Sequence, residues 1–103
     1  MPQLIVTVEG VEVRHVYLSR DRTTLGRGPD NDIVLHNPAV SSRHCAFDLK
    51  GLTDVFVEDV GSTNGTFVNN KKIKRQRLRD EDVIAIAGFR LRYLAATPAS
   101  GLR

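Results

Sequence analysis

The sequence has very little cysteine and no long apolar run. Only Cys45 among the 103 residues carries a thiol, so an intrachain disulfide is excluded. Its place in an alternating apolar run predicts a buried structural thiol in a reducing compartment. No apolar stretch approaches the roughly 18 residues that a membrane span needs, and the N-terminus lacks the positive start of a signal peptide. We therefore expect a cytoplasmic protein with no membrane association.

Sequence motifs of catalysis and of metal binding are also missing. Residues 26–31 begin like a dinucleotide-binding loop, but Asn31 stands where the third glycine belongs and no helix pattern follows. No Walker A sequence is present, and Ser62 is not central between Gly61 and Gly65 as a nucleophile elbow requires. The histidines and the cysteine show no Cys-x-x-Cys or His-x-x-x-His grouping. We expect no enzymatic activity, no metal site and no cofactor.

Length and composition indicate one globular domain. A chain of 103 residues buries roughly two thirds of the surface that it exposes when unfolded, which suits a single core. Apolar residues make up 41% and charged residues 26%, a balance that excludes a disordered or collagen-like chain. The formal charge of +3 favours anionic partners in general, without separating nucleic acid from phosphoprotein or acidic lipid.

Apolar residues recur at every second position, which is the period of half-buried strands. The alternating positions are Leu4, Val6 and Val8; Cys45, Phe47 and Leu49; Val55 and Val57; and Phe89, Leu91 and Tyr93. Turn-forming residues such as Asn64-Gly65 separate these runs, and no capped amphipathic helix of ten or more residues is present. Many short strands with frequent turns predict an all-β fold, an antiparallel sandwich or barrel.

Two local features refine this prediction. The phase of the apolar positions slips between Val13 and Val16, which predicts a β-bulge near Arg14-His15. The last strand is expected to end near residue 94, so that the domain spans residues 1–94. Residues 95–103 are small and polar with a proline, and they are predicted to form a tail or linker.

Four strings rich in glycine, serine, threonine and asparagine follow one another with loop-sized gaps. They are Thr24-Leu25-Gly26-Arg27, Asn31-Asp32-Ile33, Val40-Ser41-Ser42-Arg43-His44 and Asp59-Val60-Gly61-Ser62-Thr63-Asn64-Gly65-Thr66-Phe67-Val68-Asn69. Their order and spacing resemble the forkhead-associated (FHA) domain family, and the likeness covers nearly the whole chain from about Leu4 to Leu94. The resemblance implies an antiparallel β-sandwich of about eleven short strands whose loops at one end bind phosphothreonine peptides. The family is among the known readers of phosphorylated motifs.

The resemblance also implies which residues bind the peptide. They are Arg27, Ser41, Ser42, Arg43, Thr63 and Asn64. Arg27 would meet two phosphate oxygens with its guanidinium, while Ser41 offers a hydroxyl and a backbone N–H and Thr63 a second hydroxyl. Asn64 would clamp the main chain of the peptide, or serve as the left-handed residue of an Asn-Gly turn. Ser42 and Arg43 flank the phosphate loop and are expected to contact the peptide.

Other residues of the same strings are expected to support the loops. They are Gly26, His44, Gly61 and Gly65. His44 follows Ser41 by three residues and precedes an apolar run, so it should point inward and hydrogen-bond the loops in place. Gly26 and Gly61 are expected to permit close backbone approach or a positive φ.

The chain is thus interpreted as a phosphothreonine-dependent interaction module in Ser/Thr kinase signalling, whose partner is a kinase substrate or an autophosphorylated kinase. A rival interpretation is nucleic-acid or anionic-surface binding through the basic residues of segment 71–79. That segment has no interleaved aromatic for base stacking, and charged residues often protect a sheet edge. A third interpretation is protein binding that does not need phosphate.

Overall fold

The computed structural model describes residues 1–51 and 53–95, which contain eleven strands and no helix. The strands are β1 Gln3–Val8, β2 Val11–Tyr17, β3 Arg22–Gly26, β4 Ile33–Val34, β5 Cys45–Lys50, β6 Asp54–Asp59, β7 Phe67–Val68, β8 Lys71–Lys72, β9 Arg75–Arg77, β10 Val83–Ile86 and β11 Phe89–Leu94. No helix in this part of the chain is long and apolar enough to cross a membrane. The tail expected over residues 95–103 lies outside the described residues, apart from Ala95.

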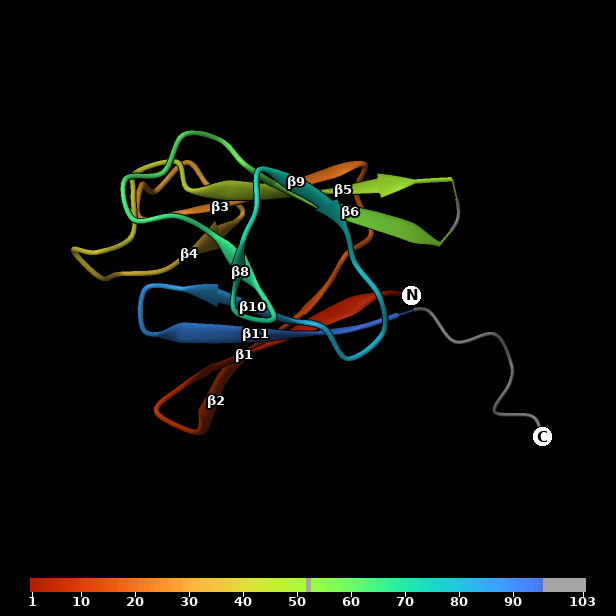
Figure 1. The fold of residues 1–103 in the computed structure, drawn as a ribbon, viewed down its shortest axis with the longest axis horizontal. Coiled ribbons are helices and arrows are strands. Elements are labelled where there is room, and N and C mark those ends of the chain that lie inside the picture. The colour runs from red at the N-terminus through yellow and green to blue at the C-terminus, as the bar shows by residue number, and fades with distance from the viewer. Residues whose placement is uncertain (52, 96–103) are drawn as a thin grey trace.

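The strands form two sheets that stack face to face (Figure 1). One sheet has the order β2-β1-β11-β10-β7-β8 and the other the order β4-β3-β5-β6-β9. Every pairing is antiparallel except the short contact of β3 with β4, which is parallel. The predicted β-sandwich is therefore confirmed, with a mixed second sheet in place of a purely antiparallel one.

The core lies between the sheets and follows the predicted alternation. Leu4 and Val6 of β1 face inward beside Leu91 and Tyr93 of β11, and each of these four side chains is at most 1% exposed. The second sheet contributes Phe47 and Val57 among others, equally buried. Cys45 is 1% exposed, and its burial raises the pKa of the thiol, as expected of a structural cysteine.

Strand β2 leaves its first two apolar residues exposed. Val11 is 62% and Val13 48% exposed. The strand is the edge of its sheet and pairs only with β1. The predicted bulge is present slightly earlier than expected: Arg14 pairs with Val6 and Glu12 with Thr7, which leaves Val13 as the extra residue.

Strand β5 is buried on both faces, which its alternation did not predict. Asp48 points to the outer face and is only 6% exposed, because Arg22 and Arg75 cover it with hydrogen bonds of 2.7 and 2.8 Å. Burial opposes ionisation of this carboxyl, but the hydrogen bonds and charges of the two arginines hold its pKa below the usual value. On the outer face of this sheet, the side chains of Arg22 and Arg75 thus cover Asp48 with ion pairs.

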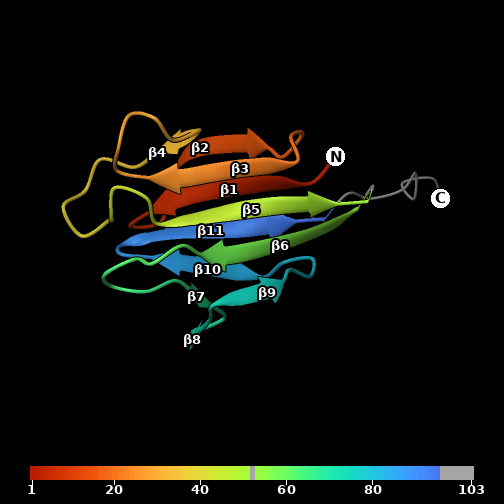
Figure 2. The ribbon, with the colours of Figure 1, turned by 90° about the horizontal axis from the view of Figure 1, so that it is seen from above.

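Three connections meet at one end of the sandwich. They are the β3–β4 loop (residues 27–32), the β4–β5 loop (residues 35–44) and the β6–β7 loop (residues 60–66). Figure 2 shows them together beyond the ends of the strands, while the N-terminus and the end of β11 lie toward the other end. The predicted binding residues are all in these loops.

Candidate functional site

The β3–β4 loop begins where two backbones touch. A Cβ added at Gly26 would lie 2.2 Å from the carbonyl oxygen of Ser42, so only glycine fits without a shift of backbone. Beyond this contact the N–H of Arg27 donates to Ser41 O at 2.9 Å, and the N–H of Gly28 donates to Ser42 O at 3.1 Å. These bonds join the β3–β4 loop to the β4–β5 loop.

The side chain of Arg27 is anchored but its charge is not paired. Its Nε donates to the carbonyl oxygen of Val40 at 2.9 Å, which fixes the orientation of the guanidinium while the residue stays exposed. Within residues 1–51 and 53–95, Arg27 takes part in no ion pair, whereas arginines at five other positions each contact a carboxylate. Its two terminal nitrogens are therefore oriented and available to an anion.

Ser41 joins the β4–β5 and β6–β7 loops. Its hydroxyl oxygen accepts a hydrogen bond of 2.9 Å from the N–H of Thr63, which leaves the hydroxyl hydrogen available. Its backbone N–H donates to Nδ1 of His44 at 3.1 Å. Both the hydroxyl and the backbone N–H of Ser41 are expected from the sequence to bind phosphate. Because His44 accepts from the N–H, only the hydroxyl is available to an external ligand. Thr63, which is exposed, is joined to Ser41 through its backbone N–H.

His44 is fully buried and holds both loops. Nδ1 accepts from the Ser41 N–H, so the ring hydrogen lies on Nε2, which donates to the carbonyl oxygen of Gly65 at 2.9 Å. The backbone of His44 also bonds to Leu25 O and to Val60 N–H. Because both ring nitrogens are used for structure and neither contacts the Ser41 hydroxyl, the site contains no serine–histidine pair for nucleophilic catalysis.

Asn64 extends from the β6–β7 loop toward the β4–β5 loop. Its side-chain amide donates to the carbonyl oxygen of Ala39 at 2.9 Å. Its φ is not positive, so the suggested role as the left-handed residue of the turn is wrong. Gly61 and Gly65 have the positive φ values of +100° and +93°, because glycine adopts that region without strain. Asn64 thus keeps its carbonyl oxygen and one N–H for a ligand.

Ser42 and Arg43 are less closely joined to the other predicted residues. Ser42 is exposed, and its carbonyl oxygen accepts from Gly28 N–H and from the Asn31 side chain. Arg43 borders a small cavity of about 100 Å³ with Arg22 and Thr24. The structure therefore brings Arg27, Ser41, Thr63 and Asn64 into one linked group and leaves Arg43 to one side.

Two residues that sequence analysis did not select prove to organise the loops. The Asn31 amide donates to Gly28 O at 2.9 Å and to Ser42 O at 2.8 Å. The Asp59 carboxylate accepts from the N–H groups of Gly61 and Ser62 and from the hydroxyls of Ser62 and Thr66. An Asp followed within three residues by Gly and Ser is a turn-forming pattern that pointed to this role.

The hydrogen bonds to Asp59 stabilise its charged form. Burial raises the pKa of this carboxyl, but the bonds from Ser62, Thr66 and Gly61 outweigh burial and lower the pKa from 3.8 to about 2. The negative charge of Asp59 is therefore stabilised by hydrogen-bond donors of the β6–β7 loop.

Comparison with known proteins identifies similar chains. The sequence model of the FHA domain family matches residues 23–87. The glycogen accumulation regulator GarA of Mycolicibacterium smegmatis is 43% identical over 77 residues, 75% of this chain and 48% of that protein. The oxoglutarate dehydrogenase inhibitor of Corynebacterium efficiens is 43% identical over 82 residues, 80% of this chain and 57% of that protein. The chain thus spans about half the length of these curated relatives.

A solved structure supports the same comparison. It comes from a structural and functional analysis of phosphothreonine-dependent FHA domain interactions, and it superposes with a TM-score of 0.81 at 28% identity. The match covers 93% of this chain and 98% of that chain. The two-sheet arrangement described above is therefore shared with a known domain over nearly its full length.

The contact at Gly26 generates a prediction about folding. Gly26→Ala should lower the free energy of unfolding by about 1–3 kcal/mol, because the added methyl meets backbone that no rotamer can move. Gly88→Ala is the matched control, since a Cβ there meets nothing within 4 Å, and it should change stability by no more than about 0.5 kcal/mol. Urea unfolding of both variants measures this, and equal stability would contradict the close contact.

Asp59 generates a prediction about pH. Because its folded pKa is depressed to about 2 from 3.8, its stabilising contribution is complete above pH 4 and is lost as the pH falls toward 2. The contribution should be about 1–2 kcal/mol after allowance for solvent screening. Unfolding of the wild type and of Asp59→Asn at pH values from 7 to 2 checks this. The stability difference should shrink over that window, and a difference independent of pH would be inconsistent with a role for the carboxylate charge.

Proposed function

The chain belongs to the FHA domain family, and on that premise we propose that it binds phosphothreonine-containing peptides of a partner protein through Arg27, Ser41, Thr63 and Asn64. It acts as a non-catalytic interaction module. Its partners are substrates of Ser/Thr kinases or autophosphorylated kinases, and we place it in the cytoplasm, where the Cys45 thiol stays reduced.

The observation that carries this proposal is the unpaired, oriented charge of Arg27. A guanidinium fixed at Nε presents its two terminal nitrogens in one plane, the geometry that binds two phosphate oxygens. Ser41 accepts hydrogen bonds from the backbone N–H groups of both Arg27 and Thr63, so the hydroxyls of Ser41 and Thr63 belong to residues next to this guanidinium, and a phosphothreonine dianion has the acceptors to use them. The Asn64 amide can bond the main chain on either side of the phosphorylated residue.

The similar proteins support a regulatory role. Those named above are called a regulator of glycogen accumulation and an inhibitor of oxoglutarate dehydrogenase, and both names describe regulation of another activity. The solved relative concerns phosphothreonine-dependent interactions. We infer that this domain regulates by recruiting or covering a phosphorylated partner.

Nucleic-acid binding through segment 71–79 has less support. Arg75 pairs with Asp48 at 2.8 Å and also lies 4.8 Å from the centre of the Phe56 ring. Arg77 pairs with Asp54 at 3.1 Å. Two of the basic side chains are therefore engaged within the protein, and counterion release on a polyanion needs free cations.

Removal of the Arg27 guanidinium is the direct test. Arg27→Ala should weaken binding of a phosphothreonine peptide by about 2–5 kcal/mol, as expected for loss of a close charge pair. Arg14→Ala in exposed strand β2 removes the same charge from a residue that has no ion pair within residues 1–51 and 53–95, and it should leave binding nearly unchanged. Titration calorimetry, with melting curves to show that both variants fold, measures the difference. Near-native affinity of the Arg27 variant would refute the assignment.

A second test compares phosphothreonine with phosphoserine in the same peptide. The two ligands differ by one methyl, whose burial between the loops is worth about 0.8 kcal/mol, or roughly fourfold in affinity. The stiff χ1 of the β-branched residue should add to this by restricting the free peptide. We expect at least about fourfold tighter binding of the phosphothreonine form. Equal dissociation constants would refute a methyl niche while leaving phosphate recognition intact.

A further inference from the structure

The basic segment 71–79 consists of two groups with different surroundings. Arg75 and Arg77 lie on the outer face of their sheet in ion pairs with Asp48 and Asp54. Lys72 and Lys74 are exposed, and within the described residues neither takes part in an ion pair or a side-chain hydrogen bond. No carboxylate of the described part of the chain therefore pairs with either ammonium group.

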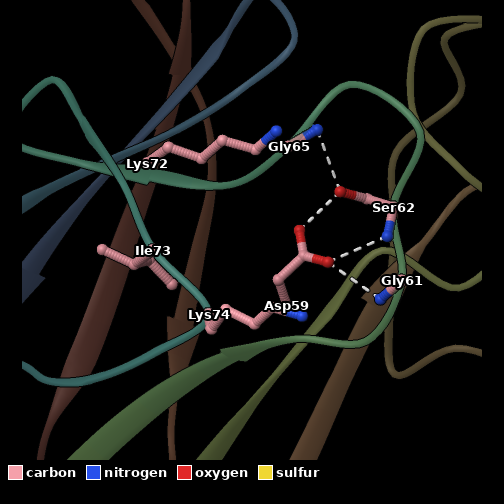
Figure 3. A pocket seen from close by; sticks show the side chains of 7 residues that line it. All are labelled: Asp59, Gly61, Ser62, Gly65, Lys72, Ile73 and Lys74. Atoms are coloured by element: carbon pink, nitrogen blue, oxygen red, sulfur yellow. Dashed lines mark hydrogen bonds between the residues drawn. The ribbon is translucent and has the colours of Figure 1, made fainter.

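Both lysines border a cavity of about 420 Å³ beside the β6–β7 loop. Figure 3 shows Lys72, Ile73 and Lys74 on one side of this cavity and the turn from Asp59 to Gly65 on the other. Lys72 ends strand β8 and Lys74 lies in the bend that precedes β9, and both residues line this cavity. The cavity is large enough for a carboxylate or a phosphate group.

The one carboxylate in the cavity does not pair with these lysines. Both oxygens of Asp59 accept hydrogen bonds from the turn itself, as the dashed lines from Gly61 and Ser62 in Figure 3 show. Thr66 adds a further bond to the same carboxylate at 2.7 Å. Asp59 thus shapes the wall of the cavity, and the ammonium groups remain available to an anion from outside.

The cavity adjoins the proposed peptide-binding residues. A Cβ at Gly65 would lie 3.0 Å from Cε of Lys72, so the end of the lysine stem packs on that glycine. Asn64 is the preceding residue, and adjacent Cα atoms are only about 3.8 Å apart. A peptide whose main chain is held by Asn64 therefore has neighbouring side chains within reach of the Lys72 ammonium.

We propose that Lys72 and Lys74 form a second anion site, which receives an acidic or phosphorylated side chain a few residues away from the phosphothreonine in the same bound peptide. This proposal rests on the proposed function, since Arg27 and its neighbours must first hold the peptide. Lysine ammonium groups act as point charges without a planar fork, so the site reads charge with little demand on geometry. It selects partners that carry a second negative group near the phosphothreonine.

The test uses phosphothreonine peptides that differ at one position. Alanine, glutamate, lysine or phosphoserine is placed in turn at each of the three positions on either side, and binding to the 103-residue chain is measured by fluorescence anisotropy. At one or two positions glutamate and phosphoserine should bind about three- to tenfold more tightly than alanine, as expected for one or two exposed ion pairs. At those positions the peptide with lysine should bind more weakly than the peptide with alanine.

Matched variants distinguish binding at this site from a general effect of positive charge on the protein. Lys72→Met and Lys74→Met remove an ammonium but keep an apolar stem, and each should reduce the gain while leaving the alanine peptide bound as before. Lys71→Met, next in the same strand but outside the cavity, removes the same charge and should keep the gain. Equal loss in all three variants, or no gain at any position, would overturn the second site.

Two further outcomes are distinguishable. An equal gain for glutamate and phosphoserine indicates a carboxylate partner, whereas a larger gain for phosphoserine that falls between pH 7.5 and 5.5 indicates a second phosphate, whose second pKa is about 6. Both support the site. If no phosphothreonine peptide binds at all, the proposed function fails and the second site fails with it, whereas binding of the alanine peptides without a gain overturns the second site alone.

Discussion

The loop end of the sandwich depends on the buried imidazole of His44. Its two ring nitrogens bond to Ser41 in one loop and to Gly65 in another, and its backbone bonds to Leu25 at the end of β3. Because these partners belong to segments that are distant in sequence, one side chain sets the distance between the loops. Ser41 then accepts a hydrogen bond from the N–H of Thr63, which fixes the position of the Ser41 hydroxyl.

The charged side chains that the structure describes fall into two groups, those paired with an opposite charge and those without such a partner. On the sheet faces arginines lie against carboxylates, as with Asp48 between Arg22 and Arg75. At the loop end Arg27 and Lys72 lack such partners within the described residues, and Asp59 turns its charge into its own loop. The unpaired positive charge of Arg27 therefore lies where the β3–β4, β4–β5 and β6–β7 loops meet at one end of the sandwich.

Several features of the fold and site were predictable from single residues and their neighbours. The alternation of Leu4 and Val6 predicted a half-buried strand, and both side chains are buried. His44 was expected to point inward, and its side chain is also buried. Exposure of Val11 and Val13 was not predictable, because alternation does not reveal which strand lies at an edge. Likewise, nothing in the local pattern showed that the Ser41 N–H would be used by the histidine three residues later.

The sequence by itself determined the fold class, because that depends on local periodicity and turn chemistry, and its spacing excluded the catalytic motifs considered above. Its resemblance to the FHA family indicated which loop residues to propose for peptide binding. Only the tertiary structure decided which donors remain available and which charges remain unpaired. Arg75 and Lys72 look alike in the sequence, but Arg75 on β9 reaches over β6 to pair with Asp48 on β5, whereas Lys72 borders a cavity. That difference arises from contacts between residues far apart in the chain, which spacing along one strand cannot encode.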